Sequence, residues 1–317
     1  DRLLRWESIL VVLLIAVIVG NTAISPYFLD IYNLSDATYN FSEKAIVALA
    51  MALLILVREI DLSVAAIIAL ASIAIGLAAQ AGAGLPVLLL IGPLVGAACG
   101  AFNGFLVTRI ALPSIVVTIG TMSLFRGLAQ VVLGDQAITQ YPKNLTAIGQ
   151  SYLIKWPPLP YSFVIFLALA VIFAVVLHKT ALGRKLYAIG NNPVAARFSG
   201  IPVDRIRFML FVLTGLLAGL AAVLLTARIG STRPNIALGW ELEIITAVIL
   251  GGVSIVGGSG TIPGVVLAVF ILGLATFGLS LVNVPGIVIS VLLGLLLIVS
   301  IALPIVVRRL MQKRPAG

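Results

Sequence analysis

Apolar residues in this chain come in long, nearly unbroken runs rather than in the alternating patterns of soluble helices or strands. About ten runs are long enough to cross a bilayer, whose hydrocarbon core needs roughly 20 apolar residues. We expect each run to form a helix, because a helix satisfies its own backbone hydrogen bonds within lipid. The expected spans are residues 8–23, 42–57, 62–79, 86–107, 112–133, 161–177, 208–227, 242–256, 261–281 and 286–307.

Composition places the chain among membrane proteins and leaves little chemistry for catalysis. Of its 317 residues, 61% are hydrophobic and only 10% are charged, whereas soluble domains carry about 25% charged residues. One cysteine and one histidine exclude disulfide scaffolds and clusters of metal ligands, so we expect no metal. The sequence lacks a P-loop, a zinc-protease motif and a nucleophile elbow, so we expect neither an enzyme nor a cofactor in this chain.

Basic residues set the expected orientation. Most of the 20 Lys and Arg residues fall at the two termini and in alternate loops. Cytoplasmic loops carry such an excess, so we expect both termini in the cytoplasm, residues 179–207 inside, and residues 135–160 and 229–241 in the periplasm. The first apolar run lacks a cleavage site and is interpreted as an uncleaved span. The net charge of +9 indicates loops beside anionic lipid, not nucleic-acid binding. The whole chain, 1–317, is expected to form a single transmembrane domain.

The most basic segment, residues 179–207, lies between the sixth and seventh expected spans. Asn192 can cap a helix, Pro193 suits the first helical position, and Gly200 suits its end. We predict a short capped helix that serves as a docking element at the inner face; an ordinary charged loop is the alternative. The residues assigned to this element are Gly190, Asn191, Asn192, Pro193, Ala195, Ala196, Arg197, Ser199 and Gly200.

Two segments interrupt the apolar pattern at membrane depth. Residues 58–63 place several ionisable groups together, and residues 251–260 are rich in glycine. Charges are costly in hydrocarbon, and glycine at this density disfavours a continuous helix. Each segment is interpreted either as a tight turn between spans or as a broken helix beside a substrate path, and both interpretations stay open.

Polar side chains in or beside the spans are the candidates for a translocation path. The guanidinium of Arg126 must face a wet cavity or bond to backbone carbonyls, and we favour the second interpretation. Neutral hydroxyl and amide groups suit an uncharged polyhydroxy solute, but they equally form bonds between helices. The path candidates are Asp61, Ser63, Asn103, Thr118, Thr121, Ser123, Arg126 and Ser254.

Both expected periplasmic loops are rich in polar and aromatic residues. Several prolines in residues 135–160 indicate a rigid surface feature. The aromatic side chains either form a belt at the headgroup level, which is the commoner case, or form a rim where a delivery protein docks. The docking candidates are Trp156, Arg233, Trp240, Glu241 and Glu243.

Several motifs together resemble one protein family over nearly the whole chain. They are EIDLSV at 59–64, TIGTMS at 118–123, AIGNNP at 188–193, SGIPV at 199–203, AVILGG at 247–252 and GGSG at 257–260. The chain resembles the permease subunits of bacterial ATP-binding-cassette sugar importers of the ribose type. Among these it is most similar to permeases for rhamnose and for the furanosyl autoinducer. Glu59 departs from this family, which commonly has glycine at that position.

This resemblance implies partners and roles for the segments described above. The helix after Asn192 would be a coupling helix that sits in a groove of a cytoplasmic ATPase, whose two nucleotide-binding domains hold ATP and Mg²⁺. The outer loops would dock a periplasmic solute-binding protein. A second permease subunit, identical or a paralogue, would complete the complex in the bacterial inner membrane.

Two rival functions remain open from the residues alone. A stand-alone secondary transporter or exporter of a small polar solute would need ionisable groups within the membrane, and beyond Arg126 there are few candidates. A membrane enzyme acting on lipid-linked sugars would need a site at Glu241 or Glu243, and neither has a plausible partner base. We therefore expect a permease that moves a sugar or sugar-like solute inward by alternating access.

Overall fold

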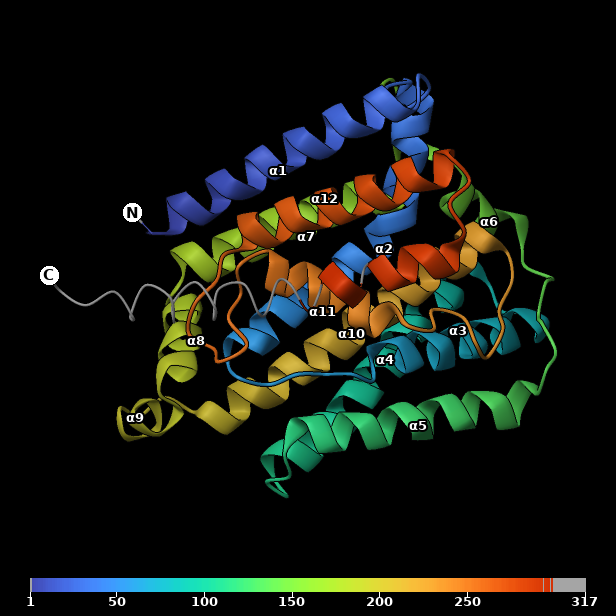
Figure 1. The fold of residues 1–317 in the computed structure, drawn as a ribbon. Coiled ribbons are helices and arrows are strands. Elements are labelled where there is room, and N and C mark those ends of the chain that lie inside the picture. The colour runs from blue at the N-terminus through green and yellow to red at the C-terminus, as the bar shows by residue number, and fades with distance from the viewer. Residues whose placement is uncertain (1, 293, 297, 299–317) are drawn as a thin grey trace, which may run out of the picture.

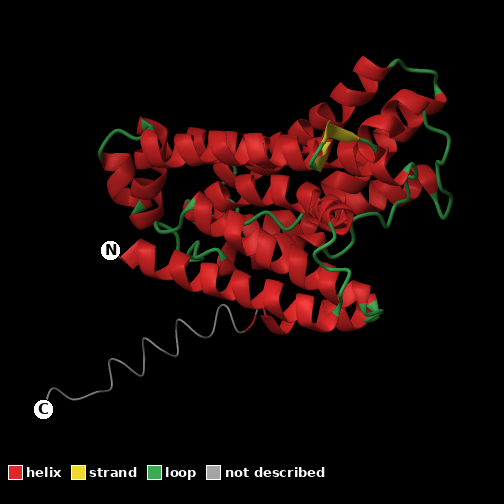
Figure 2. Ribbon diagram, turned by 90° about the horizontal axis from the view of Figure 1, so that it is seen from above, coloured by secondary structure: helices red, strands yellow, loops and turns green. Residues whose placement is uncertain are grey.

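The computed structural model describes residues 2–292, 294–296 and 298, which form a helical bundle with one small antiparallel hairpin (Figures 1 and 2). A further apolar helix, Gly286–Leu296, follows the last of the labelled elements. In chain order these elements are α1 (Arg2–Ile24), α2 (Ile31–Leu56), α3 (Val64–Gln80), α4 (Leu85–Thr108), α5 (Ser114–Leu133), α6 (Lys143–Gln150), β1 (Tyr152–Lys155), β2 (Pro158–Pro160), α7 (Tyr161–Lys179), α8 (Ala181–Asn191), α9 (Pro193–Phe198), α10 (Val203–Ile229), α11 (Trp240–Leu250) and α12 (Ile262–Leu281).

Seven helices in the described part of the chain are long and apolar enough to cross a membrane. They are α1, α2, α4, α5, α7, α10 and α12, and each corresponds to one expected span. α3 and the helix Gly286–Leu296 are apolar but shorter, and α11 has 11 residues. The prediction of a multi-span helical protein is confirmed. The second half of the last expected span, 286–307, and the basic residues after it lie outside the described residues.

The second span is longer than its apolar run predicted. α2 begins at Ile31 rather than at residue 42, because the Asp30 carboxylate caps it by accepting hydrogen bonds from two backbone N–H groups of the first turn. This polar extension packs on the hairpin, where the Ser35 hydroxyl donates to the Pro158 carbonyl over 2.6 Å. The hydropathy pattern could not reveal the extension, because its residues are helical without being apolar.

Glycine ends α11 earlier than expected. The predicted span 242–256 is wrong in its second half, because α11 stops at Leu250 and turns follow until α12. Gly252, Gly257 and Gly258 have φ of 87°, 84° and 77°, the left-handed region that side-chain-bearing residues avoid. The opposite error occurs at α10, which begins at Val203 rather than at residue 208.

α4 and α10 lie in backbone contact through their glycines. A Cβ placed on Gly96 would lie 2.1 Å from the Gly215 carbonyl oxygen, and a Cβ on Gly219 would lie 2.1 Å from the Gly92 carbonyl oxygen. Small residues permit this close approach, and it is common where membrane helices associate. α2 is largely buried and also packs on α10, so these helices form the centre of the bundle.

The two ends of the bundle carry different elements. α8, α9 and the start of α1 lie at one end, and α6 and the segment that follows α10 lie at the opposite end (Figure 1). We call these the α9 end and the α6 end. The loop after α2 and the glycine-rich segment before α12 belong to the α9 end, because Arg58 and Gly258 contact α8 there.

Candidate functional site

α9 is a short helix whose start and stop are set locally. Asn192 is its N-cap, and the Asn192 Oδ1 atom accepts hydrogen bonds from the backbone N–H groups of Val194 and Ala195, both at 3.0 Å. Pro193 occupies the first turn, where its missing N–H costs nothing. Gly200 follows the helix with φ 81°. The capped helix predicted from the sequence is therefore present.

The outward face of α9 is apolar. Val194 is 62% exposed and Phe198 is 90% exposed, and these two residues lie one helical turn apart. Ala196 faces inward and is buried. Arg197 lies beside this face, and its guanidinium pairs with Asp204 over 2.6 Å. Phe198 is not among the residues predicted from the sequence, although its spacing from Val194 was an available signal.

The residues just before α9 contact both segments that interrupt the apolar pattern, residues 58–63 and 251–260. Arg58 donates from Nε to the Gly190 carbonyl and from Nη2 to the Asn191 carbonyl, both at 2.7 Å. The Gly258 N–H donates to the Leu56 carbonyl over 2.9 Å. We call these five residues the junction. Gly190 is buried within it, since a Cβ there would lie 2.1 Å from the Leu56 carbonyl oxygen. Gly190 thus allows close packing rather than lining the exposed face.

A second contact ties the loop after α2 to α10. Glu59 is 6% exposed, and its carboxylate lies 3.1 Å from the Arg207 guanidinium. Burial raises the pKa of Glu59, and the charge of Arg207 opposes that shift. Arg207 also donates to the Val57 carbonyl over 3.3 Å. The loop is therefore fixed to α10 as well as to α8.

Three path candidates come together beside this loop. Asp61 accepts hydrogen bonds from the Ser63 N–H (2.8 Å) and the Ser63 hydroxyl (2.6 Å). The Asn103 amide, from α4, donates to Asp61 Oδ2 (3.3 Å) and to the Ser63 hydroxyl (2.8 Å). All three side chains are fully buried. Within the described residues, Asp61 pairs with no cation and Asn103 Oδ1 has no hydrogen-bond partner.

The other path candidates that carry hydroxyl groups lie outside this cluster. Thr118 donates mainly to the Ser114 carbonyl of its own helix over 2.8 Å, and more distantly to the Ile60 carbonyl over 3.4 Å. Thr121 bonds the Thr118 carbonyl over 3.4 Å. Ser123 is exposed on α5, and Ser254 lies in the glycine-rich segment. These contacts favour local packing for the threonines.

Arg126 ties α5 to the segment that follows α10. Its Nη1 donates to the carbonyls of Pro234 (2.6 Å) and Ile236 (2.8 Å). This is the bonding to backbone carbonyls that we favoured from the sequence. The partner is an irregular segment at the α6 end rather than another helix.

The docking candidates divide into exposed and inward-facing residues. Trp156 is 71% exposed and Arg233 is also exposed, whereas Glu241 is half-buried. Glu243 forms an ion pair with Lys44, and the Lys44 ammonium lies 4.9 Å from the centroid of the Trp240 ring. Trp240 and Glu243 therefore both contact α2.

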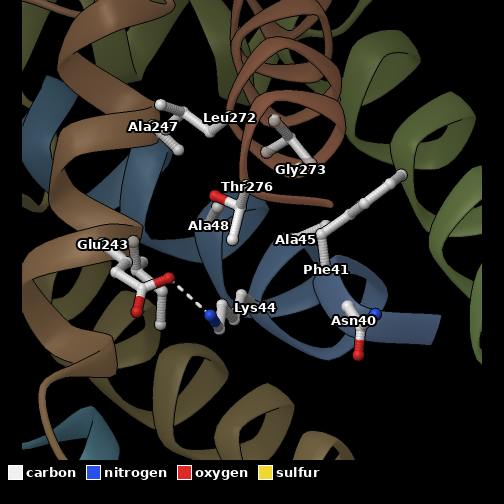
Figure 3. Close-up of a pocket in the computed structure, with 12 residues that line it drawn as sticks. Asn40, Phe41, Lys44, Ala45, Ala48, Glu243, Ala247, Leu272, Gly273 and Thr276 are labelled. Atoms are coloured by element: carbon white, nitrogen blue, oxygen red, sulfur yellow. Dashed lines mark hydrogen bonds and ion pairs between the residues drawn. The ribbon is translucent and has the colours of Figure 1, made fainter. Parts of the chain in front are cut away.

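Lys44 and Glu243 lie at one edge of a mostly apolar pocket between α2, α11 and α12 (Figure 3). The pocket has an empty volume of about 480 Å³, counting its open mouth. Phe41 and Leu272 line it together with small residues, and Asn40 and Thr276 add polar groups. Lys44 points at Glu243 across the pocket edge (Figure 3), so these charges neutralise each other. This pocket was not predicted from the sequence.

The apolar helices of the bundle and the segments that interrupt them are those of a multi-pass membrane protein. The chain belongs to the family described as branched-chain amino acid transport system / permease component, whose model matches residues 33–301. It is 38% identical over 302 residues to the autoinducer 2 import system permease protein LsrD of Escherichia coli (strain K12). The same protein of Escherichia coli O9:H4 (strain HS) and of Shigella flexneri gives equal values, each alignment covering 93% of this chain and 91% of the relative. No solved structure matches the chain.

These similarities confirm the resemblance read from the motifs. The chain is a permease component of an importer and not an enzyme. The two rival functions, a stand-alone transporter and an enzyme acting on lipid-linked sugars, are therefore set aside.

Proposed function

We propose that this permease moves a furanosyl autoinducer, or a rhamnose-like monosaccharide, into the cytoplasm. The relatives named above are autoinducer 2 import permeases, and the identity to them extends over nearly the whole chain. The neutral hydroxyl and amide groups at membrane depth suit an uncharged polyhydroxy solute. Of the path candidates, Asp61, Ser63 and Asn103 lie together and are fully buried.

The α9 end faces the cytoplasm in this proposal, and the chain crosses the membrane ten times. Crossings by α1, α2, α3, α4, α5, α7, α10, α11, α12 and the helix that begins at Gly286 place both termini on the same side. Basic residues gather on that side, as cytoplasmic loops require. A second permease subunit, identical or a paralogue, completes the pathway.

α9 is the coupling helix for a cytoplasmic ATPase with two nucleotide-binding domains, which hold ATP and Mg²⁺. The observation that carries this proposal is the position of α9: its exposed face bears Val194 and Phe198, and its base continues into the junction. A displacement of α9 by the ATPase therefore acts directly on the loop after α2 and on the glycine-rich segment. Such a motion can switch the path from opening outward to opening inward only if the ATPase contacts these two states of the permease differently.

At the α6 end, the proposal assigns docking of the periplasmic solute-binding protein to Trp156 and Arg233, which are exposed. Glu241 is half-buried, and Trp240 and Glu243 contact Lys44 of α2.

Replacing Phe198 tests the assignment of α9. An aromatic side chain buried in an interface commonly contributes about 2 kcal/mol or more, which is roughly a 30-fold change in affinity. We expect Phe198→Ser to lose the ATPase during purification of the complex and to lose solute uptake in proteoliposomes. Leu238→Ser is the matched control, because Leu238 is 71% exposed at the α6 end. Normal ATPase retention and uptake in Phe198→Ser would refute the assignment of α9 and leave family membership untouched.

A further inference from the structure

A polar cleft with aromatic walls opens at the α6 end. The side chains that line it come from α2, from α6 and the hairpin, and from the end of α10. Its volume is about 350 Å³, which lies at the lower end of the range of roughly 300–1,000 Å³ found for small-molecule sites. We call it the outer cleft. It is lined by Asp36, Tyr39, Asn40, Gln150, Tyr152 and Arg228.

A fully buried carboxylate orients the arginine of the outer cleft. Glu43 is 0% exposed, and its Oε1 accepts a hydrogen bond from Arg228 Nε over 2.8 Å. Within the described residues, Glu43 Oε2 and the two Nη groups of Arg228 have no hydrogen-bond partner. A buried carboxylate in a membrane protein is costly, and such residues commonly serve function. Here it fixes Arg228 and leaves both Nη groups available at the cleft.

The walls of the outer cleft offer acceptors and aromatic faces. The rings of Tyr39 and Tyr152 lie 6.1 Å apart at an angle of 45°. The Tyr152 hydroxyl donates to Asp36 over 3.4 Å, and the Tyr39 hydroxyl donates to the Ser151 carbonyl over 3.0 Å. Asn40 uses its Nδ2 in a long bond to the Asp36 carbonyl, and its Oδ1 is free within the described residues. The cleft thus holds donors, acceptors and ring faces around one space.

The charge of the outer cleft distinguishes between ligand classes. Arg228 is already balanced by Glu43, and Asp36 adds a further negative charge. An anionic ligand such as a phosphorylated sugar would meet net repulsion. A neutral solute with several hydroxyl groups can instead accept from Arg228, donate to Asp36 and Asn40, and place its C–H face against a tyrosine ring.

We propose that the outer cleft is a receiving site for a neutral, polyhydroxylated solute on the permease itself. This inference rests on the proposed import of a sugar-like solute and identifies where that solute first contacts the chain. Arg228, Asp36 and Asn40 bind the hydroxyl groups, and Glu43 is a positioning residue that acts through Arg228.

Direct binding tests the receiving site. The purified permease–ATPase complex, without the binding protein, is titrated with autoinducer 2 and with L-rhamnose by saturation-transfer NMR. We expect binding of one of these solutes by the unmodified complex, and at least about a tenfold weaker affinity in Asp36→Asn and Asn40→Ala, which corresponds to about 1.4 kcal/mol. Both residues are exposed, so neither change disturbs the core. Asp135→Asn and Asn144→Ala are the matched controls, because these residues are exposed at the same end but lie outside the cleft.

Further variants separate the possible causes of a loss. Arg228→Lys keeps the charge beside Glu43, and we expect weaker solute binding with an unchanged melting temperature. Unchanged binding in Asp36→Asn and Asn40→Ala, or equal losses in the controls, would overturn the receiving site. If Asp36→Asn and Asn40→Ala instead bind the solute normally and, in a separate pull-down, no longer bind the binding protein, the cleft is a protein surface and the inference is wrong. Uptake by the full system without any binding to the permease also overturns it while leaving the importer intact, whereas absence of uptake of both solutes overturns the proposed substrate class.

Discussion

Arg58 offers the sharpest test of the junction, because its side chain bonds to two consecutive carbonyls just before α9. Its Nε bond to Gly190 is partly buried and its Nη2 bond to Asn191 is exposed. A hydrogen bond from a charged donor contributes about 1.5–3 kcal/mol when shielded and less when solvated. We take about 2 kcal/mol for the two bonds together. This corresponds to roughly a 30-fold change in the equilibrium between states in which α9 is held by the junction and states in which it is not.

Two substitutions separate this bonding from general destabilisation. Arg58 has φ 70°, a left-handed conformation that costs a non-glycine residue about 1–2 kcal/mol. Arg58→Ala loses both bonds and keeps the strained backbone, whereas Arg58→Gly loses the same bonds and relieves the strain. We therefore expect Arg58→Gly to melt at a higher temperature than Arg58→Ala, with equal loss of coupling in both.

The assay measures solute imported per ATP hydrolysed in proteoliposomes that contain the permease, its ATPase and the binding protein. Both Arg58 variants should hydrolyse ATP with little dependence on solute, and import should fall by about tenfold or more. Arg184→Lys is the control, because Arg184 is exposed on α8 and donates no side-chain hydrogen bond within the described residues. If coupling in the two variants follows melting temperature rather than bond loss, or if import per ATP is unchanged, the reasoning about the junction is refuted.

Two other predictions follow from the packing and the cap. Gly96→Ala should strongly reduce the melting temperature, because its Cβ would lie 2.1 Å from the Gly215 carbonyl oxygen and such overpacking costs about 1–3 kcal/mol or more. Gly127→Ala is the control and should melt near the unmodified protein, because a Cβ at Gly127 would meet nothing within 4 Å. Equal melting temperatures of the two variants would contradict the contact between α4 and α10. Asn192→Ala should destabilise α9 by about 1 kcal/mol, which would appear as faster amide hydrogen exchange in residues 193–198. Asn192→Asp retains a capping side chain and should exchange at the unmodified rate. Equal exchange rates in both variants would exclude capping as the cause.

Local signals in the sequence were sufficient for some elements. The order Asn192, Pro193 and Gly200 predicted α9, because capping, the helix start and the helix stop each depend on neighbouring residues. Apolar length likewise located the spans. It misplaced the start of α2, since Asp30 begins that helix within a polar segment, and it extended α11 past Leu250 into the glycine-rich turns.

Contacts between distant positions were not available from the sequence. Arg228 and Glu43 are 185 positions apart, and Arg58 and Gly190 are 132 positions apart. Nothing local to any of these residues indicates its partner. The same limit applies to Trp240 and Glu243, whose contacts with Lys44 on α2 were not predicted. Pairing across the bundle depends on how the helices pack, which the hydropathy pattern does not encode.

The glycine contacts between α4 and α10 restrict how these two helices can move relative to each other. Gly92, Gly96, Gly215 and Gly219 bring the two backbones so close that sliding or rotation of one helix against the other would force main-chain atoms into each other. We therefore expect α4 and α10 to move together as one unit during transport. Conformational changes would then occur in the segments around α4 and α10. The subunit would therefore have fewer independently moving parts than it has helices.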